Sequence, residues 1–325
     1  MKSNPEISII VPTYNREILL PFTLESIFSQ TYKDYEIIIV DDGSTDSTRV
    51  LISNLINDRS ERIRYFYQSN SGCGAARRKG VHESSGKYLT ILDSDDLWLP
   101  FFLEILHAKI EKNPEFGMVY SGILDYDSNK KSLTNVNFKG KSGNLLYEMV
   151  FKKLHICHGQ SLIRKSCIDK VGNFNSKLRM LEDREFNYRM SKEFNFLYVD
   201  YPLFIDRKHG IGNKPIPKGA GSKVITYSEQ INKYERFFLH SLLNDKHLHK
   251  KYIFFQRRIL SNSVKSWGLH FFVRGELKKA QSFFIKSILL YPLNLISFMF
   301  LFASFMGIYN KRKSKTINDI EASNI

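Results

Sequence analysis

Short strand-like runs alternate with helix-like segments over the first third of the chain, and this alternation constrains the fold more than any other feature. The first run, residues 7–11, is continuous, apolar and rich in β-branched residues, which is typical of a buried parallel strand. The predicted strands are residues 7–11, 35–40, 63–67 and 88–92. The helical segments between them are residues 17–30, 46–57 and 75–84. This order predicts an α/β fold with a mostly parallel sheet and helices on both of its faces.

The remainder of the chain extends this pattern and then becomes helical. The further predicted elements are a helix at 100–112, a strand at 118–126, a loop or hairpin at 127–141, a strand and short helix at 159–170, a helix at 181–192 and a strand at 196–206. Residues 209–222 are rich in Gly, Pro and Lys, which predicts a mobile loop. Helices dominate from 224 to about 308.

Composition limits the class of protein and its partners. The 325 residues are 42% hydrophobic and 25% charged, as in a globular protein. A net charge of +15 fits nucleic acid, an anionic membrane or a phosphorylated substrate, and because no nucleic-acid-reading motif is present we expect no nucleic-acid partner. Three cysteines without a CxxC pair indicate neither a zinc site nor a disulfide framework, so a reducing, cytoplasmic compartment is expected.

Polar and acidic clusters follow three of the predicted strands. They are Pro12-Thr13-Tyr14-Asn15, Asp41-Asp42 and Asp93-Ser94-Asp95-Asp96. In open α/β sheets ligands bind outside the carboxyl ends of the strands, so these clusters are expected to gather at one edge. Two carboxylates one residue apart, Asp93 and Asp95, can face Mg²⁺ or Mn²⁺, although a solvated acidic loop or helix cap is the alternative. Asp41-Asp42 can accept hydrogen bonds from a base or ribose, or can simply form a turn.

Four segments together resemble the family 2 glycosyltransferases of the GT-A fold, a Rossmann-like arrangement. They are SIIVPTYN at 8–15, IIIVDDGSTD at 37–46, GAARR at 74–78 and YLTILDSDD at 88–96. The resemblance is clear over residues 6–125 and weaker to about 210. It implies inverting transfer of a sugar from a UDP-, GDP- or dTDP-activated donor, a UDP-sugar first among them, with a divalent cation, Mn²⁺ or Mg²⁺. It also implies a membrane-associated role in polysaccharide or glycolipid assembly.

The resemblance also implies roles for particular residues. Those of the nucleotide-sugar site are Pro12, Thr13, Tyr14, Glu17, Asp41, Asp42, Arg77 near the diphosphate, and Asp93 at the ribose or metal. Asp95 is implied as the main metal contact. Position 78 departs from the family's frequent asparagine, so no role is assigned to Arg78. The chain would divide into a catalytic domain at 1–222, with a nucleotide-sugar half at 1–125 and an acceptor half at 126–222, a helical region at 223–310 and a polar tail at 311–325.

An inverting transfer needs a carboxylate base, and Glu182-Asp183 at a helix start resembles the family's acidic pair, with Asp183 at the base position. The simpler interpretation is an acidic first turn that suits the helix dipole. Arg207 and His209 open the predicted loop and are candidates for a lid over the diphosphate, although a histidine there can equally be an ordinary surface residue. His155 and His158 lack a matching third metal ligand, which favours packing or acceptor-site roles.

The C-terminal region contains an uncharged stretch, residues 287–309. Pro292 and Asn294 interrupt it, which predicts two helices rather than one membrane span. Basic residues flank both of its ends, so we expect a basic, Phe-rich helical hairpin at the cytoplasmic face of an anionic membrane, with a buried helical pair as the alternative.

The sequence therefore predicts an enzyme that transfers a sugar to a hydroxyl of a glycan or lipid-linked acceptor. A nucleotidyltransferase is the enzymatic alternative, but it would have a Gly-rich loop after the first strand, where this chain has residues 12–15. A catalytically inactive scaffold on the same fold would have lost Asp95 or Asp183, and both are present. No motif selects the donor sugar or the acceptor.

Overall fold

The computed structural model places the chain in two compact units, Met1–Tyr234 and Glu235–Ile325, which are described separately below. The residues it describes are 4–59, 62–137, 140–151, 154–178, 181–208, 261, 265, 268, 269, 272 and 276–305. The predicted loop at 209–222, the predicted domain boundary after it and the polar tail lie outside these residues, so all three remain predictions.

The N-terminal unit alternates strands and helices as predicted. Its strands are β1 Ile7–Thr13, β2 Tyr35–Asp41, β3 Ile63–Tyr67, β4 Tyr88–Ile91, β5 Leu97–Trp98, β6 Phe116–Asp127, β7 Ser132–Asn137, β8 Ser161–Arg164 and β9 Asn195–Lys208. Its helices are α1 Leu20–Phe28, α2 Thr48–Arg59, α3 Cys73–Glu83, α4 Phe102–Lys112, α5 Leu146–Phe151, the 3₁₀ turn η1 His158–Gln160, α6 Lys165–Val171 and α7 Glu182–Glu193. The loop-or-hairpin prediction after β6 is confirmed as a hairpin, because β7 pairs antiparallel with β6.

The strands form one mixed sheet in the order β3-β2-β1-β4-β8-β6-β9-β5, with β7 paired to β6. Parallel pairing joins β3, β2, β1 and β4, and it also joins β6 to β9. The strand β8 runs antiparallel to both β4 and β6, so β1–β4, β6 and β9 all point the same way. The carboxyl ends of these six strands therefore lie at one edge of the sheet, as the sequence predicts.

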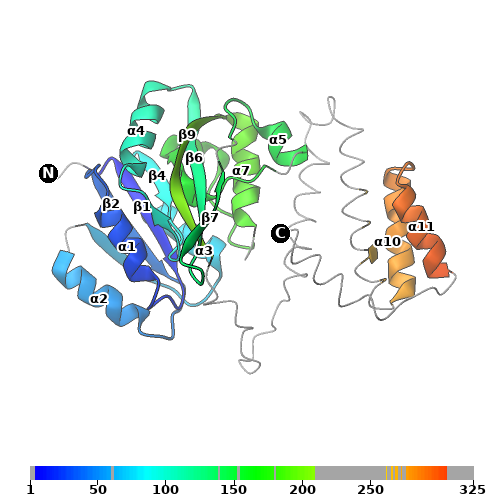
Figure 1. The fold of residues 1–325 in the computed structure, drawn as a ribbon, viewed down its shortest axis with the longest axis horizontal. Helices are drawn as coiled ribbons and strands as arrows, with labels where there is room; N and C mark the ends of the chain where they lie inside the picture. Colours follow the sequence, from blue (N-terminus) through cyan, green and yellow to red (C-terminus); the bar gives the residue numbers. More distant parts are fainter. Residues whose placement is uncertain are drawn as a thin grey trace. The chain divides into compact units, whose positions relative to one another are not determined.

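Helices cover both faces of the sheet (Figure 1). On one face, apolar residues of α1, α2 and α4 pack with Ile7, Ile9 and Val11 of β1 in a single core cluster. On the other face, residues of α3, α6 and α7 pack with Ile10 of β1 and with residues of β4, β6, β8 and β9. The alternation of side chains along β1 thus serves two cores, which explains why its sequence is continuously apolar.

Two glycines let α3 lie close to its neighbours. A Cβ atom at Gly80 would lie 2.3 Å from Cγ2 of Ile10 in β1. A Cβ atom at Gly74 would lie 2.5 Å from the carbonyl oxygen of Leu178, in the segment before α7. The small residues of the GAARRKG stretch therefore hold α3 against the sheet and near the start of α7, where the acidic pair lies.

The short strand β5 is absent from the sequence-based prediction. It consists of Leu97 and Trp98, which pair antiparallel with β9 immediately after the acidic cluster. The indole Nε1 of Trp98 donates to the carbonyl oxygen of Gly159 at 2.6 Å, and its ring stacks on Phe102. Two residues give no periodic signal, but these contacts fix the far end of the acidic loop.

In the C-terminal unit, the uncharged stretch contains the end of one helix and the whole of a second, so it is divided between two helices, as predicted. They are α10 Leu277–Leu290 and α11 Leu295–Phe305, and the break falls at Pro292 and Asn294. Rings of Phe272, Phe284 and Phe300 pack together in a small core. Among the helices described, none combines the length and apolarity needed to cross a bilayer.

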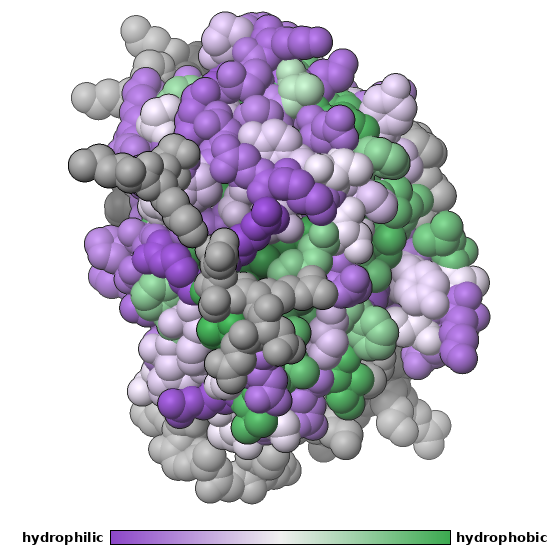
Figure 2. Space-filling model, turned by 90° about the vertical axis from the view of Figure 1, so that its left-hand side faces the viewer, coloured by the Kyte–Doolittle hydropathy of each residue, from purple (hydrophilic) through white to green (hydrophobic). Residues whose placement is uncertain are grey.

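The two units differ in their exposed apolar side chains. In the N-terminal unit these lie on separate elements: Tyr14, Ile18, Phe22, Val50, Tyr67, Phe101, Leu133 and Tyr201. Hydrophilic residues predominate on the face of the molecule in Figure 2, with smaller hydrophobic patches between them. Single exposed hydrophobics of this kind are ordinary. In the C-terminal unit, by contrast, they are concentrated on α10, α11 and the turn between them: Ile285, Leu289, Leu293, Leu295, Ile296, Phe298, Met299, Phe302 and Phe305.

Candidate active site

A cleft of about 230 Å³ opens at the carboxyl edge of the sheet, beyond the end of β4. Its walls come from α3, the loop after β4, the turn η1, the first turn of α7 and the end of β9. The lining residues are Arg77, Asp93, Asp95, Asp96, Cys157, His158, Gly159, Asp183, Phe204, Asp206 and Arg207. Asp93, Asp95 and Asp183, which lie up to ninety positions apart in the sequence, therefore share one cleft.

The aspartates after β4 concentrate negative charge at the cleft. Asp93 accepts two hydrogen bonds from Nη2 of Arg77, at 2.7 and 2.9 Å. Asp95 pairs through Oδ2 with Nη2 of Arg16 at 2.9 Å. Burial, and then the negative charges of Asp95 and Asp93, raise the pKa of Asp96 well above its usual range. Cationic groups already engage two of these carboxylates, and the raised pKa reflects how much negative charge is gathered here.

Arg77 is buried and joins the acidic loop to α7. Its Nη1 forms a buried ion pair with Oε1 of Glu182, while Nη2 binds Asp93. Burial alone would lower the pKa of Arg77, but the nearby charges, that of Asp93 foremost, raise it well above its usual value. Burial raises the pKa of Glu182 despite the opposing effect of Arg77. The guanidinium thus has a structural role at the cleft wall, and its predicted contact with a diphosphate stays a prediction.

Asp183 lies in the first turn of α7, next to Glu182 but in a different environment. Leu181, which precedes the helix, has a φ of 60°, a left-handed conformation that is uncommon for a leucine and is found at constrained functional sites. The carboxylate of Asp183 accepts from the backbone N–H of Arg184 at 2.8 Å through Oδ1, and Oδ2 lies 3.2 Å from Nε2 of His155. Burial would raise the pKa of Asp183, but the electrostatic effects of His155 and Arg77 outweigh it and lower the pKa.

The residues after β1 lie outside the set that lines the cleft. Pro12 and Thr13 are buried in β1, and the Thr13 hydroxyl has no hydrogen-bond partner among the described residues. Tyr14 is 44% exposed, so its ring is accessible to a ligand. Glu17 accepts from the backbone N–H of Ser47 at 2.9 Å, which joins the loops after β1 and β2. The predicted nucleotide contacts of these residues remain predictions.

The carboxylates of Asp41 and Asp42 are buried and support loops in the structure. Asp41 accepts from the backbone N–H of Ser44 and from the Tyr65 hydroxyl, at 2.8 and 2.9 Å. Asp42 accepts from the side-chain amide of Gln68 and from the backbone N–H groups of Ser71 and Gly72. The turn interpretation describes this geometry better than a ligand contact, and a base or ribose contact by either aspartate stays a prediction.

Arg207 forms part of the cleft wall at the end of β9. Its backbone N–H donates to Asp96 at 3.0 Å, and its guanidinium donates to the carbonyl oxygens of Asp95 and Leu19 and to the Thr23 hydroxyl. This side chain is buried and fastens the acidic loop to α1. The lid role predicted for it remains a prediction, and His209 lies outside the described residues.

Sequence reasoning missed two residues at the site, Arg16 and Asp206, and the pairing of Glu182 with Arg77. Arg16 follows the PTYN segment and pairs with Asp95, Asp206 lines the cleft from β9, and Glu182 is the buried partner of Arg77. Asp206 had a usable signal, because it ends a predicted strand as the other cleft aspartates do. Arg16 and Glu182 had none, since each pairing depends on tertiary packing.

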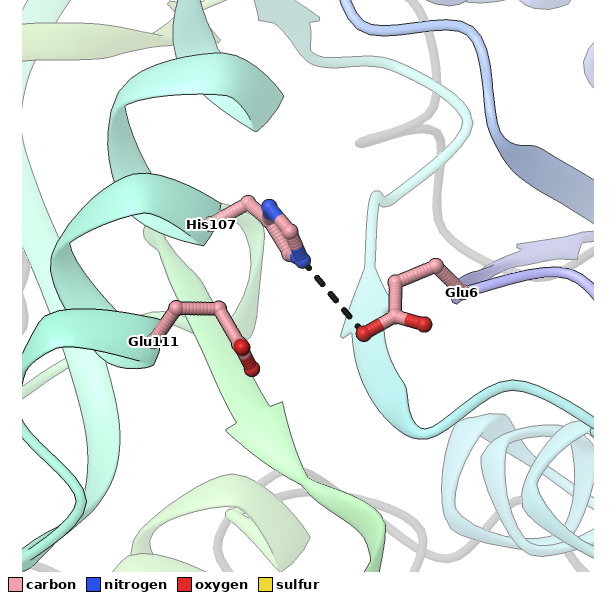
Figure 3. A group of neighbouring side chains, drawn as sticks. All are labelled: Glu6, His107 and Glu111. Carbon is pink, nitrogen blue, oxygen red and sulfur yellow. Dashed lines mark hydrogen bonds and ion pairs between the residues drawn. The ribbon is translucent and has the colours of Figure 1, made fainter.

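A second group of metal-binding residue types lies in the structure, before β1 and on α4. Glu6, His107 and Glu111 point toward one another (Figure 3). The ammonium group of Lys87 lies 2.7 Å from Oε1 of Glu111 and 3.3 Å from Oε1 of Glu6, so a cation already bridges the two carboxylates. Hydrogen bonding to Lys87 is the main cause that lowers the pKa of Glu111 to about 2. We interpret this group as a salt-bridge cluster that ties α4 to the amino ends of β1 and β4.

The family model described as glycosyl transferase family 2 matches residues 8–172, just over half of the chain. The chain belongs to glycosyltransferase family 2. The matched range contains β1 to β4 and the acidic loop. It ends before α7, so Asp183 lies outside it.

Several curated relatives share this family 2 region. An uncharacterized glycosyltransferase of Rickettsia typhi is 32% identical over 215 residues, which are 63% of this chain and 65% of that protein. The Campylobacter jejuni GalNAc(5)-diNAcBac-PP-undecaprenol beta-1,3-glucosyltransferase is 36% identical over 46% of this chain and 52% of that protein. A PGL/p-HBAD biosynthesis glycosyltransferase of Mycobacterium bovis is 31% identical over 57% of this chain and 69% of that protein. The chain spans only 21% and 24% of two longer relatives from Rickettsia bellii and Rickettsia felis.

Solved structures confirm the fold class. S. aureus TarS 1-349 in complex with UDP has a TM-score of 0.64 and 16% identity, covering 96% of this chain and 91% of that one. The same protein in complex with UDP-GlcNAc has a TM-score of 0.64 and 18% identity, covering 88% of this chain and 81% of that one. The predicted GT-A fold with C-terminal helices is therefore confirmed for this family 2 chain.

Proposed function

We propose that this chain is an inverting glycosyltransferase that moves a sugar from a UDP-sugar to a hydroxyl of a glycan or lipid-linked acceptor. One observation carries the proposal: the acidic cluster after β4 and Asp183 of α7 line the same cleft. A donor diphosphate with its cation and a carboxylate base can therefore act on the two sides of one reacting sugar.

The proposed donor is a UDP-sugar for two reasons. The TarS structures with the same fold hold UDP and UDP-GlcNAc. At their low sequence identity, the likeness to this chain shows only the fold. In this chain, the exposed ring of Tyr14 follows β1 at the carboxyl edge and offers a surface on which a base can stack. Thr13 adds a buried hydroxyl without a partner among the described residues. Both features support a nucleotide in this position.

The residues at the cleft fit a divalent cation, Mn²⁺ or Mg²⁺. Asp93, Asp95 and Asp206 supply carboxylate oxygens at the cleft, the ligand type that these ions prefer. The guanidinium of Arg16 already binds Asp95, which shows that this carboxylate attracts positive charge. We propose that Asp95, assisted by Asp93, holds the ion. When bound, it would neutralise charge on the departing nucleoside diphosphate.

Asp183, rather than Glu182, is the proposed base. Glu182 is buried and engaged by Arg77, and its pKa is raised chiefly by burial. Asp183 faces the cleft and has a lowered pKa, so it is ionised at neutral pH. An ionised carboxylate on the acceptor side can take the proton of the attacking hydroxyl, while the oxygen forms its bond to C1 of the sugar.

The purified protein should hydrolyse or transfer from one member of a UDP-, GDP- and dTDP-sugar panel when Mn²⁺ is present. EDTA should abolish this activity and added Mn²⁺ should restore it, because the acidic wall cannot balance the diphosphate's charge alone. Released nucleotide measures the reaction, and isothermal titration of UDP with and without Mn²⁺ measures binding. Absence of turnover and of UDP binding across the panel would refute the proposed function.

We also propose that the C-terminal unit binds an anionic membrane surface at its cytoplasmic face. Every exposed residue of α11 is a large hydrophobic one: Leu295, Ile296, Phe298, Met299, Phe302 and Phe305. Its buried positions are Ser297 and Ser304, so the usual distribution of polar and apolar residues is inverted. Exposed Lys278, Lys279 and Lys286 on α10 supply positive charge beside this apolar helix. Apolar area together with basic charge is what an in-plane membrane anchor presents.

A lipid surface also suits the acceptor class. The name of the Campylobacter jejuni relative gives an undecaprenol-linked glycan as its substrate. An acceptor of that class would be confined to the membrane, so an enzyme bound there would meet it at a high local concentration. We therefore favour lipid over a second copy of the chain as the partner of α11.

The variant Phe302→Asp is expected to lower binding to vesicles that contain anionic lipid by about tenfold or more, because it places a charge on the apolar face. Co-sedimentation with phosphatidylglycerol vesicles measures the change, and raised salt should also weaken binding. Phe101→Asp, at an exposed position on the N-terminal unit, is the matched control and should bind as the unaltered chain does. Equal binding by both variants would contradict the membrane role, and a change in oligomeric state instead would point to a second copy.

A further inference from the structure

We propose that His155 is a positioning residue that holds the carboxylate of Asp183 in the orientation needed to take the acceptor's proton. This inference rests on the proposed role of Asp183 as base. It concerns a residue that lies before η1, outside the acidic loop and outside α7.

The two side chains lie in close polar contact. Nε2 of His155 lies 3.2 Å from Oδ2 of Asp183. The carboxylate is ionised and can only accept, so we assign the ring hydrogen to Nε2. Nδ1 of His155 is buried and has no partner among the described residues, so the contact with Asp183 is the polar interaction that orients this ring in the described structure. Oδ1 of Asp183 is held separately by the backbone N–H of Arg184.

A second set of contacts fixes the histidine segment to α7. Asn187 lies one helical turn after Asp183, so its side chain is on the same side of α7. Its Nδ2 donates to the carbonyl oxygen of Ile156 at 2.7 Å, and its Oδ1 lies 3.2 Å from Nε2 of His158. The ring of His158 also packs edge-on against Phe174 and Phe186. Asn187 therefore holds residues 156–158 in register with the helix, and this register brings His155 opposite Asp183.

The base needs such support because its helix turn is exposed to the cleft. A carboxylate at the start of a helix can rotate about its side-chain bonds, and a displacement of about 1 Å can cost about 100-fold in rate. In this structure, one oxygen accepts a hydrogen bond from a backbone N–H and the other lies against an imidazole nitrogen. These two contacts restrict the rotation of the carboxylate. His155 thus contributes to the rate through Asp183 and does not itself touch the donor.

The charges around the pair define how pH should act. Asp183 is faced by His155 and His158, by Arg77 from α3, by Arg184 and Glu182 of its own helix, and by Cys157. Burial lowers the pKa of His155, although the negative charge of Asp183 opposes this shift. Burial also lowers the pKa of His158, to about 3, so that ring stays neutral over the accessible range. Of the two histidines, His155 has the larger effect on the pKa of Asp183.

The variant His155→Ala is expected to lower kcat by about 10- to 100-fold and to leave the KM for the donor and the affinity for UDP unchanged. The carboxylate would lose a neighbour whose electrostatic effect lowers its pKa, so its pKa should rise. The acid limb of the kcat profile should accordingly move to higher pH. His155→Gln, whose amide can donate from nearly the same position, should restore much of the rate. His82→Ala, at an exposed position at the end of α3, is the control and should be unaffected.

A readout independent of turnover separates this inference from the proposed function. The negative charge of Asp183 raises the pKa of His155, so Asp183→Asn should shift the NMR titration of the His155 ring to lower pH. An unchanged titration would overturn the contact. Wild-type kcat and pH profile in His155→Ala, or equal losses in His155→Ala and His155→Gln, would overturn the positioning role. If Asp183→Asn keeps full activity, the base assignment fails instead, whatever His155 does.

Discussion

Replacing Asp183 with asparagine is expected to lower kcat by about 10²- to 10⁴-fold, the range that a general base contributes. Asparagine has nearly the same shape and its Oδ1 can still accept a hydrogen bond from the backbone N–H of Arg184, so the cleft should keep its form. The amide cannot take the acceptor's proton. UDP binding should be unchanged, because the nucleotide is proposed to bind on the side of the acidic loop. Steady-state kinetics with the best donor and titration of UDP provide the two measurements.

The control for this variant is Asp169→Asn, at an exposed position on α6, which should retain full activity. A preserved rate in Asp183→Asn would show that the acceptor's proton leaves by another route, with Asp206 as the next carboxylate to replace. Loss of UDP binding together with activity would place Asp183 in the donor site. The first result would move the role of the base to another residue. The second would move Asp183 from the acceptor side of the cleft to the donor side.

The convergence of Asp93, Asp95 and Asp183 was predictable because it follows from topology. The acidic loop follows a strand whose apolar run is plain in the sequence, and parallel strands end at one edge of a sheet. The acidic start of α7 was expected at the site because Glu182-Asp183 resembles the family's acidic pair. The cleft geometry depends on strand order rather than on fine packing, so sequence patterns were sufficient for it.

Other features of the site depend on burial and register, which the local sequence does not encode. Asp41 and Asp42 look like ligands by position, but loop N–H groups fill their acceptor sites in the structure. Glu182 has a sufficient local explanation as an acid at a helix start, so nothing pointed to an ion pair with a residue 105 positions away. His155 meets Asp183 only because Asn187 sets the register of a short irregular segment. The contacts of Asp42, Glu182 and His155 are long-range and were therefore missed.

The variant Arg77→Met is expected to destabilise the N-terminal unit by about 3–5 kcal/mol, because it leaves the buried carboxylate of Glu182 without its partner. Asp93 contributes less to this loss, since its side chain is 42% exposed and water can replace the guanidinium. Chemical denaturation followed by tryptophan fluorescence measures the free energy of unfolding. Because α3 packs closely against the segment before α7, the structure can relax little around the unpaired carboxylate of Glu182.

Two further variants test whether the unpaired charge is the cause. Arg77→Met combined with Glu182→Gln removes both charges and should recover much of the lost stability, and Glu182→Gln alone should be milder than Arg77→Met because Arg77 keeps Asp93. The pKa of Glu182 is already raised by burial and should rise further without Arg77. Because the folded-state pKa of Glu182 is raised, its carboxyl group does not destabilise the fold below the usual glutamate pKa. The destabilisation develops as the pH rises from that value through the raised pKa. Arg77→Met should therefore lose less stability at pH 5 than at pH 8, and an equal loss at both would show that lost packing, rather than charge, holds α3 to α7.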